Sequence, residues 1–394
     1  MQHEQAFTLP QPDASSAEHS TRCAAYICER IRDSGGTISF AEFMHYALYA
    51  PGLGYYSAGA RKFGADGDFV TAPEISSLFG KVLARQCAQV LEAVGDGSVL
   101  EFGAGSGKLA VDILRALSKL GALPAEYRIL EISADLRERQ QRLLQEETPE
   151  FADRVVWLDR MPESHRGVIV ANEVLDALPV ERFLIKEGAV RQLRVTDELG
   201  EFVFVDEVAP DVLANAVRAV EHDIGATLPN KYVSEISLSS AAWIGDMAGS
   251  LQNGFTFLFD YGLSRAEYYA RDRNEGWLRC YFRHRAHSDP LILPGIQDLS
   301  AWVDFSAVAK AAVEHGLAVA GYLNQTQFLL GGGLDREVGD MSELPLESQR
   351  ELSGQIKILT LPGEMGENVK CIGLARGDIP WPDAFESTDR THTL

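Results

Sequence analysis

A glycine-rich turn between a short apolar strand and a helix limits the folds that this chain can adopt. Ser98–Phe102 predicts a buried strand, Gly103-Ala-Gly-Ser-Gly107 follows it, and Lys108–Leu120 has apolar residues at helical spacing. Glycines at such a turn let the backbone bend tightly and approach a ligand closely. The turn therefore predicts an α/β fold in which a ligand binds at the carboxyl ends of parallel strands.

Strand-like and helical segments alternate along the rest of the chain and predict a doubly wound, Rossmann-like sheet. The seven expected strands are Ser98–Phe102, Tyr127–Ile132, Arg154–Leu158, Gly167–Ala171, Gly254–Tyr261, Leu317–Leu323 and Asn368–Ala375. An insertion separates the fourth strand from the fifth. It reads as three antiparallel strands and a helix, at Glu181–Ile185, Gln192–Thr196, Glu201–Asp206 and Pro210–His222.

Three kinds of ligand compete for the glycine turn. A P-loop needs Gly-Lys-Ser/Thr, but Leu109 follows Gly107-Lys108, so a nucleotide phosphate is excluded. A dinucleotide fingerprint needs a third glycine where Lys108 stands, so a nicotinamide cofactor is disfavoured but stays open. S-adenosylmethionine has no pyrophosphate and needs only close backbone approach, with acidic residues near its ammonium and sulfonium groups. The turn favours this third ligand.

Acidic residues stand at or near the ends of the first three strands, where a parallel sheet forms its ligand crevice. Glu101 lies near the end of the first strand, Glu131 can take both ribose hydroxyls, and Asp159 ends the third strand near the expected adenine. The predicted cofactor ligands at this edge are Glu101, Gly103, Gly105, Gly107, Glu131 and Asp159.

The segment Asn172-Glu-Val-Leu-Asp-Ala-Leu-Pro179 follows the fourth strand. That strand end faces the reactive centre in such a fold, so polar side chains there can orient an acceptor. We expect Glu173, Asp176 and Asn172 to serve catalysis. Asn172 is also a favourable residue for a helix N-cap, and both roles can hold together.

A loop before the sheet predicts a cover for the cofactor. Ser39–Glu42 forms a capping box, and Thr71–Glu74 predicts another that starts a helix running to about Val94. Between them, glycines and aromatic residues of residues 64–73 can fold over the cofactor and exclude water. We expect Asp68 and Thr71 to lie near the site of methyl transfer.

These patterns predict a division into a catalytic core and flanking parts. We expect a disordered tail at 1–20, a helical N-terminal subdomain at 21–95 and a C-terminal tail at 377–394. The core would comprise 96–180 and 231–376, with an acceptor-binding lobe inserted at 181–230.

The amino-acid composition limits the kinds of partner, the metal sites and the cellular compartment that we expect for this protein. The net charge of −21 disfavours a nucleic-acid substrate, which basic faces bind. Five scattered cysteines argue against disulfides and zinc, and His284 and His287 lack a third ligand, so we expect no metal. No stretch is apolar enough to span a bilayer, and residues 1–20 resemble neither a secretory signal nor a transit peptide, so a cytoplasmic protein is expected. A homodimer is possible.

Together these motifs resemble the MidA-type family, which includes a mitochondrial complex I assembly-factor methyltransferase and its bacterial relatives. The resemblance runs from about residue 22 to 376. Its segments are Tyr49–Tyr56, Gly67–Ile75, Leu100–Gly107, Ala171–Pro179, Asp260–Gly262, Arg283–His287, Pro294–Leu299, Val303–Phe305 and Leu361–Glu367.

The resemblance implies a class I S-adenosylmethionine-dependent methyltransferase that modifies arginine on a protein, with a complex I subunit as one candidate acceptor. In better-known arginine methyltransferases two glutamates flank a loop after the fourth strand. Glu173 fits one of these positions, and Glu181 is a weaker match for the other. Two alternatives remain, an assembly chaperone that binds the cofactor with little turnover and a nicotinamide-dependent oxidoreductase.

Overall fold

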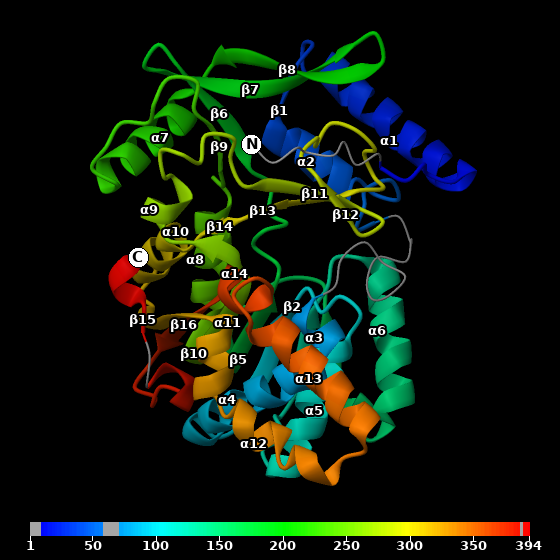
Figure 1. The fold of residues 1–394 in the computed structure, drawn as a ribbon, viewed down its shortest axis with the longest axis vertical. Helices are drawn as coiled ribbons and strands as arrows, with labels where there is room; N and C mark the ends of the chain where they lie inside the picture. The colour runs from blue at the N-terminus through cyan, green and yellow to red at the C-terminus, as the bar shows by residue number, and fades with distance from the viewer. Residues whose placement is uncertain (1–8, 58–70, 387–388) are drawn as a thin grey trace. The chain divides into compact units, whose positions relative to one another are not determined.

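The computed structural model describes residues 9–57, 71–386 and 389–394 (Figure 1). The chain divides into two compact units, each built from segments distant in sequence. Unit 1 takes the described parts of residues 1–70 together with 177–237 and 271–301, and unit 2 takes 71–176, 238–270 and 302–394.

A mixed sheet forms the centre of unit 2. Its strands lie in the order β15-β16-β10-β5-β2-β3-β4, with the short β14 paired to β10. The pairs from β4 to β10 are parallel, whereas β16 is antiparallel to both of its neighbours. The seven predicted strands and the α/β fold class are confirmed. The strands are β2 Ser98–Phe102, β3 Tyr127–Leu130, β4 Val155–Leu158, β5 His165–Asn172, β10 Leu251–Leu263, β14 Val303–Asp304, β15 Ala318–Asn324 and β16 Val369–Arg376.

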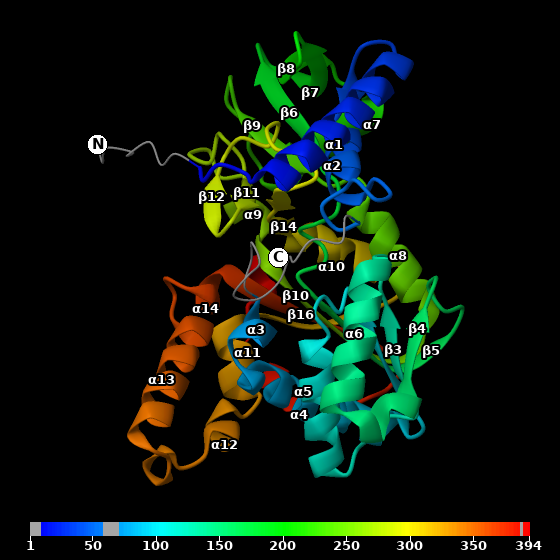
Figure 2. The same cartoon turned by 90° about the vertical axis from the view of Figure 1, so that its right-hand side faces the viewer.

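Helices cover both faces of this sheet (Figure 2). Helices α4 and α11 contact one face, and α8 and α10 contact the other. The α-helices of unit 2 are α3 Ala72–Ile75, α4 Ser77–Val94, α5 Lys108–Leu120, α6 Ala134–Glu147, α8 Ser240–Ser250, α9 Arg265–Tyr268, α10 Phe305–Glu314, α11 Gln325–Gly331, α12 Leu334–Val338, α13 Leu346–Thr360 and α14 Met365–Asn368. Short 3-10 helices occupy Pro149–Arg154, Met341–Glu343, Asp383–Phe385 and Thr391–Thr393.

The centre of the sheet is apolar on both faces, as a parallel strand between helical layers requires. Val168, Ile169 and Val170 of β5 are fully buried in succession. On the α4 face, Phe79 meets Phe259 of β10 edge-on, with 5.1 Å between ring centroids. Burial of each such side chain contributes about 1.5–3 kcal/mol, so this layer fixes the strand ends that carry the polar residues.

Unit 1 combines the predicted antiparallel insertion with the N-terminal helices. Strands β1, β7, β6 and β9 pair in that order, β8 pairs with β7, and β12-β11-β13 form a second small sheet. Phe40 and Phe43 of α2 pack against Phe204 and Phe202 of β8. The elements are α1 Ala14–Asp33, β1 Ile38–Ser39, α2 Phe40–Tyr49, β6 Glu181–Lys186, β7 Ala189–Glu198, β8 Glu201–Val208, α7 Asp211–Asp223, β9 Val233–Ile236, β11 Leu278–Phe282, β12 Arg285–His287 and β13 Asp298–Ala301.

Both expected tails contain ordered structure. Helix α1 begins at Ala14 because the Asp13 carboxylate accepts a hydrogen bond from the Ser16 N–H at 2.9 Å, so 14–20 is helical instead of disordered. Near the other end, Phe385 is buried against the sheet residues Phe255 and Phe257. Apolar packing of this kind explains why 377–394 is more than a tail.

The boundaries between the parts also differ from those expected. Helix α4 belongs to unit 2 instead of the N-terminal subdomain because its apolar face packs on β5 and β10. Residues 231–237 and 271–301 belong to unit 1 because β9 pairs with β6, and β11 pairs with β12 and β13 there. The single helix expected after Thr71 is broken at Ser76, whose backbone is extended and whose hydroxyl caps α4.

The basic segment after Arg279 forms the β11–β12 hairpin of unit 1. Arg283 and His284 occupy its turn with φ values of 49° and 59°. The Arg283 guanidinium pairs with Asp13 at 2.5 Å. Ion pairing within the chain therefore accounts for one arginine of this run.

Candidate functional site

The glycine turn joins β2 to α5 in a backbone conformation that is unfavourable for residues with a side chain. Gly103, Gly105 and Gly107 have φ values of 59°, 55° and 88°, which L-residues rarely adopt. A Cβ at Gly103 would also lie 3.1 Å from the Val174 side chain, and one at Gly107 would lie 3.2 Å from Gln140. The turn thus passes close to the segment after β5 and to α6, which explains the need for glycine.

Glu101 lies on β2, two residues before this turn. Its side chain is buried, and its carboxylate accepts a hydrogen bond of 2.7 Å from the Tyr127 hydroxyl. Burial raises the pKa of Glu101 to about 7, against the Tyr127 hydrogen bond, which lowers it. The carboxyl group therefore contacts the neighbouring strand β3 through Tyr127.

Glu131 directly follows β3 and lines a pocket of about 360 Å³. Its two oxygens accept hydrogen bonds from the Ser133 N–H at 2.9 Å and from Gln140 Nε2 at 3.1 Å. Burial raises the pKa of Glu131, while these hydrogen bonds lower it. Beside it, Ile132 is 73% exposed and offers the pocket an apolar surface.

Asp159 lines the same pocket, so the structure brings two of the predicted cofactor ligands together. The Asp159 carboxylate pairs with Arg137 at 2.8 Å, and its side chain is 87% exposed. Arg137 also donates to the Leu158 carbonyl at 2.8 Å. Arg137 therefore fixes the end of β4 at the rim of the pocket.

The segment after the loop contacts the glycine turn. Asp68 lies outside the described residues, whereas Thr71 precedes α3 and forms no side-chain cap. The capping box expected from Glu74 is absent because its carboxylate accepts a hydrogen bond from the Ser106 hydroxyl instead. Lys108 also donates to the Glu74 carbonyl at 3.0 Å. Helix α3 is thus tied to the turn.

The predicted catalytic residues lie in a tight turn after β5. Strand β5 ends at Asn172, whose side chain donates to Glu173 at 3.2 Å. Glu173 has a φ of 53°, and its N–H donates to the Phe259 carbonyl of β10 at 2.8 Å. A non-glycine residue held in this region is strained, and such strain is often found at functional sites. The turn therefore fixes the backbone position from which the Glu173 side chain projects.

Asp260 holds this turn, a role that the sequence reasoning missed. One of its carboxylate oxygens accepts the N–H groups of Val174, Leu175 and Asp176 at 2.8–3.2 Å. Burial, Asp176 and Glu173 raise the pKa of Asp260 well above its usual range. The only signal in the sequence was the Asp260-Tyr-Gly262 motif at the end of the fifth strand.

Gln140 of α6 is a second residue that the sequence reasoning missed. It is fully buried and donates to the Gly105 carbonyl at 2.9 Å as well as to Glu131. Nothing in the helical spacing of α6 distinguishes a buried polar residue from its exposed neighbours.

Glu181 opens β6 in unit 1. Its carboxylate accepts a hydrogen bond from Gln192 at 2.9 Å, and burial raises its pKa. Its side chain is partly buried, and its proposed match to the second glutamate stays a prediction.

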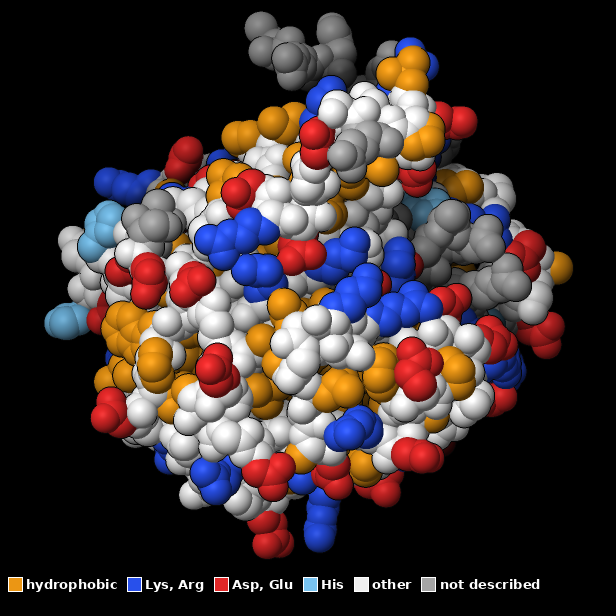
Figure 3. Space-filling model, turned by 90° about the horizontal axis from the view of Figure 1, so that it is seen from below, with side chains coloured by type: hydrophobic (Ala, Val, Ile, Leu, Met, Phe, Trp, Pro, Cys, Tyr) orange, Lys and Arg blue, Asp and Glu red, His pale blue; other side chains and the backbone are white. Residues whose placement is uncertain are grey.

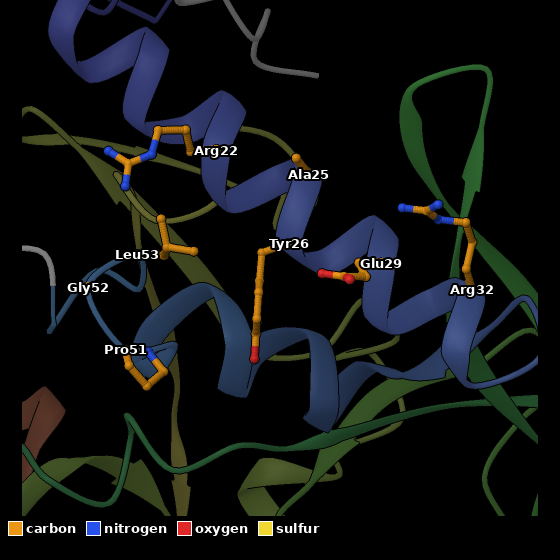
Figure 4. Close-up of a pocket in the computed structure, with 8 residues that line it drawn as sticks. All are labelled: Arg22, Ala25, Tyr26, Glu29, Arg32, Pro51, Gly52 and Leu53. Atoms are coloured by element: carbon orange, nitrogen blue, oxygen red, sulfur yellow. The ribbon is translucent and has the colours of Figure 1, made fainter.

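Unit 1 carries another pocket, of about 530 Å³, between α1 and the loop that follows α2 (Figure 4). Tyr26 extends from α1 toward α2, while Arg22, Glu29 and Arg32 project from the same helix around it. Its other lining residues are Ala25, Pro51, Gly52 and Leu53. The pocket offers an aromatic surface and charges of both signs.

The face in Figure 3 has a band of Lys and Arg with Asp and Glu around it. Within the described ranges there is no group of three or more His, Cys, Asp or Glu that could hold a metal ion. Among the same residues, no helix is long and apolar enough to cross a membrane.

Comparisons with known proteins agree with this geometry. A profile of S-adenosyl-L-methionine-dependent methyltransferases matches residues 82–323. A crystal structure from Burkholderia thailandensis, bound to S-adenosyl-homocysteine, is 40% identical, superposes with a TM-score of 0.92 and covers 98% of this chain and 100% of its own. The chain is 30% identical to the mitochondrial protein arginine methyltransferase NDUFAF7 of Danio rerio, over 84% of this chain and 82% of that protein.

The human protein of the same name is 28% identical, over 86% of this chain and 80% of its own length. The relatives and the family profile set aside the nicotinamide alternative and confirm S-adenosyl-L-methionine as the cofactor. The chain belongs to the MidA-type family of S-adenosyl-L-methionine-dependent methyltransferases.

Proposed function

We propose that the protein methylates an arginine side chain of a protein acceptor. The observation that carries this proposal is the 30% identity to a mitochondrial protein arginine methyltransferase over most of both chains. The position of Glu173, directly after β5 and held by Asp260 through the residues that follow it, supports it.

Carboxylates suit this acceptor. A guanidinium is a planar fork of N–H donors that a carboxylate can accept in pairs. Glu173 binds the guanidinium and orients one nitrogen toward the methyl group, and Asn172 holds that carboxylate in place by donating to it. Asp176, in the same turn, is the third proposed catalytic residue. The cofactor supplies a methyl group on a sulfonium, and its transfer leaves S-adenosylhomocysteine, a methylated arginine and a proton. Positioning of the two reactants provides most of the acceleration.

The pocket beside β3 and β4 holds the adenosine part of the cofactor. Glu131 accepts the ribose hydroxyls, Ile132 packs on the adenine, and the Asp159–Arg137 pair closes the rim. The glycine turn from Gly103 to Gly107 takes the methionine part, and Glu101 lies near the end of the strand that leads into it. Thr71 borders this region, and Asp68, which lies outside the described residues, stays a prediction.

The acceptor is a protein. A subunit of respiratory complex I is one candidate, because the family that this chain resembles includes a mitochondrial complex I assembly factor. The inserted strands at 181–230 form its recognition lobe together with the rest of unit 1. The pocket at Tyr26 would supply aromatic and ionic contacts to the acceptor.

Transfer of labelled methyl groups tests the proposal. Extract from cells that lack the protein is incubated with purified protein and methyl-labelled S-adenosylmethionine, treated with nuclease, and hydrolysed to amino acids. Label in methylated arginine is expected. Label only in nucleic acid, or only in lysine, would overturn the proposed acceptor class.

A matched pair of variants separates chemistry from cofactor binding. Glu173→Gln keeps shape but loses the charge that binds the guanidinium, and should lower labelling about 100-fold while S-adenosylhomocysteine still binds. Glu150→Gln changes an exposed glutamate of unit 2 and should behave as the wild type. Unchanged labelling in Glu173→Gln would remove Glu173 from the site, and a chaperone role would gain support if that variant still supported complex assembly.

A further inference from the structure

Gln140 connects three segments that the cofactor proposal treats separately. Its Nε2 donates to the Gly105 carbonyl at 2.9 Å and to the Glu131 carboxylate at 3.1 Å. Its Oε1 accepts a hydrogen bond of 3.0 Å from the indole N–H of Trp157. Gly105 follows β2, Glu131 follows β3 and Trp157 lies on β4, so one side chain joins the ends of three neighbouring strands.

The orientation of this amide is determined by its partners. A primary amide has two N–H donors and one carbonyl acceptor. Gly105 and Glu131 present only acceptors, whereas the Trp157 indole presents only a donor. A flipped amide would therefore place its oxygen against two oxygens and its N–H groups against another N–H group. Because Gln140 is fully buried, water cannot compensate for such a mismatch.

We propose that Gln140 is a positioning residue that sets the glycine turn and the Glu131 carboxylate in register for S-adenosylmethionine. The inference rests on the cofactor role proposed for Glu131 and holds whatever the acceptor is. Gln140 does not need to touch the cofactor. It acts through Gly105, which meets the methionine part, and through Glu131, which meets the ribose.

The hydrogen bond also affects the charge of Glu131. Burial raises the pKa of this carboxyl group, and hydrogen bonds from the Gln140 side chain and from the backbone N–H groups of Ser133, Gly105 and Ile132 lower it. The other charged groups that face this region are Glu101, whose own pKa Glu131 raises, and three residues that line the same pocket, Arg137, Glu138 and Asp159. None of them donates a hydrogen bond to Glu131 among the contacts of the described residues, so removal of the Gln140 amide should favour the protonated form.

Substitution with methionine tests this role because it keeps the length and removes all three hydrogen bonds. We expect Gln140→Met to bind S-adenosylhomocysteine roughly tenfold more weakly near neutral pH, as loss of a hydrogen bond to a charged group implies. On acidification its affinity should also fall at a higher pH than in the wild type, because Glu131 then protonates sooner. Calorimetric titration between about pH 5.5 and pH 8.5 measures both effects.

Control substitutions keep the test decisive. Gln145→Met changes an exposed glutamine of the same helix and should match the wild type. Trp157→Phe leaves Gln140 in place but removes the N–H that orients it, so a weaker change in the same direction is expected even if Gln140→Met does not fold. An unchanged affinity and an unchanged pH profile in Trp157→Phe and in any folded Gln140→Met would overturn the proposal.

Glu131→Gln separates this inference from the assignment on which it depends. If Glu131 takes the ribose as a carboxylate, this variant binds S-adenosylhomocysteine weakly and without the acid-dependent loss. A Glu131→Gln protein that binds like the wild type would remove Glu131 from the site, and the proposal with it. A weak Glu131→Gln together with an unaffected Gln140→Met would contradict Gln140 alone.

Discussion

Glu173 combines a strained backbone with a proposed contact to the acceptor. Its φ of 53° is shared by Glu187, with 52°, in the hairpin between β6 and β7. The hairpin needs a left-handed residue to reverse the chain, and any residue type that tolerates this conformation can serve there. The turn after β5 is not a hairpin and does not require a left-handed residue for that reason. We therefore attribute the strain at Glu173 to the position that its carboxylate must take.

Glycine substitutions should distinguish the two positions. The left-handed backbone costs a non-glycine residue about 1–2 kcal/mol of stability. Glycine avoids this cost, but it raises the conformational entropy of the unfolded chain, which costs about 0.5–1 kcal/mol. Glu173→Gly and Glu187→Gly should thus each stabilise the protein by up to about 1 kcal/mol in urea unfolding. Only Glu173→Gly should lose methyl transfer. Equal activity of the two variants would show that Glu173 is a turn residue and nothing more.

Glu101 makes stability depend on pH. Because its pKa in the folded protein is about 7, above its ordinary value of 4.5, the folded state binds more protons than the unfolded state between these two values. Its contribution to stability is therefore present in acid, declines as pH rises through this window and is flat above it.

Glu101→Gln should remove this pH dependence, since its side chain carries no charge at any pH and its amide oxygen still accepts the Tyr127 hydroxyl. The variant is expected to match the wild type near pH 5 and to exceed its stability near pH 8, as measured by urea unfolding without cofactor. Glu92→Gln, at an exposed position of α4, serves as the control. A difference between Glu101→Gln and the wild type that does not change with pH would show that Glu101 is not protonated in the folded state.

At the level of elements, Asp260 links the ends of β5 and β10. Three N–H groups of the turn after β5 depend on one of its oxygens. Asp260→Ala leaves these donors without an acceptor in a buried site and should destabilise the protein by about 3–5 kcal/mol in denaturant unfolding. Asp246→Ala, on the exposed side of α8, should cost less than about 0.5 kcal/mol.

Asp260→Asn refines the interpretation. It keeps one oxygen for the turn and avoids the repulsion from Asp176 and Glu173, but its amide nitrogen replaces the oxygen that accepts the Tyr261 N–H at 2.9 Å. Its stability should therefore lie between that of Asp260→Ala and that of the wild type. If Asp260→Ala were as stable as Asp260→Asn, the turn would not depend on this side chain.

The order of the elements was predictable where local patterns decide it. Buried strands such as Gly167–Ala171 and the capping box at Ser39 and Glu42 appear in the structure, because apolar runs and caps act over a few residues. The break at Ser76 was not predictable, since the hydroxyl that caps α4 also donates to Gln355, a residue distant in the sequence. The unit boundaries were missed for the same reason, because pairing of β9 with β6 joins distant segments.

The candidate site shows the same limit. The sequence indicated Glu131 and Asp159 through their places after strands, and the structure brings both to one pocket. It could not indicate Gln140 or the direction of Glu101. Both depend on partners from neighbouring strands, Trp157 and Tyr127, whose approach only the folded sheet determines.

At the scale of the whole molecule, the proposed cofactor site lies in unit 2 at the ends of β2, β3 and β4. Hydrogen exchange of the full chain, with and without S-adenosylhomocysteine, tests this claim most directly. Protection is expected at 103–107, at 131–141 and at 157–159, and a covering loop would add 55–73. Protection confined to the glycine turn would remove Asp68 and Thr71 from the site, and protection absent from 131–141 would contradict the central claim.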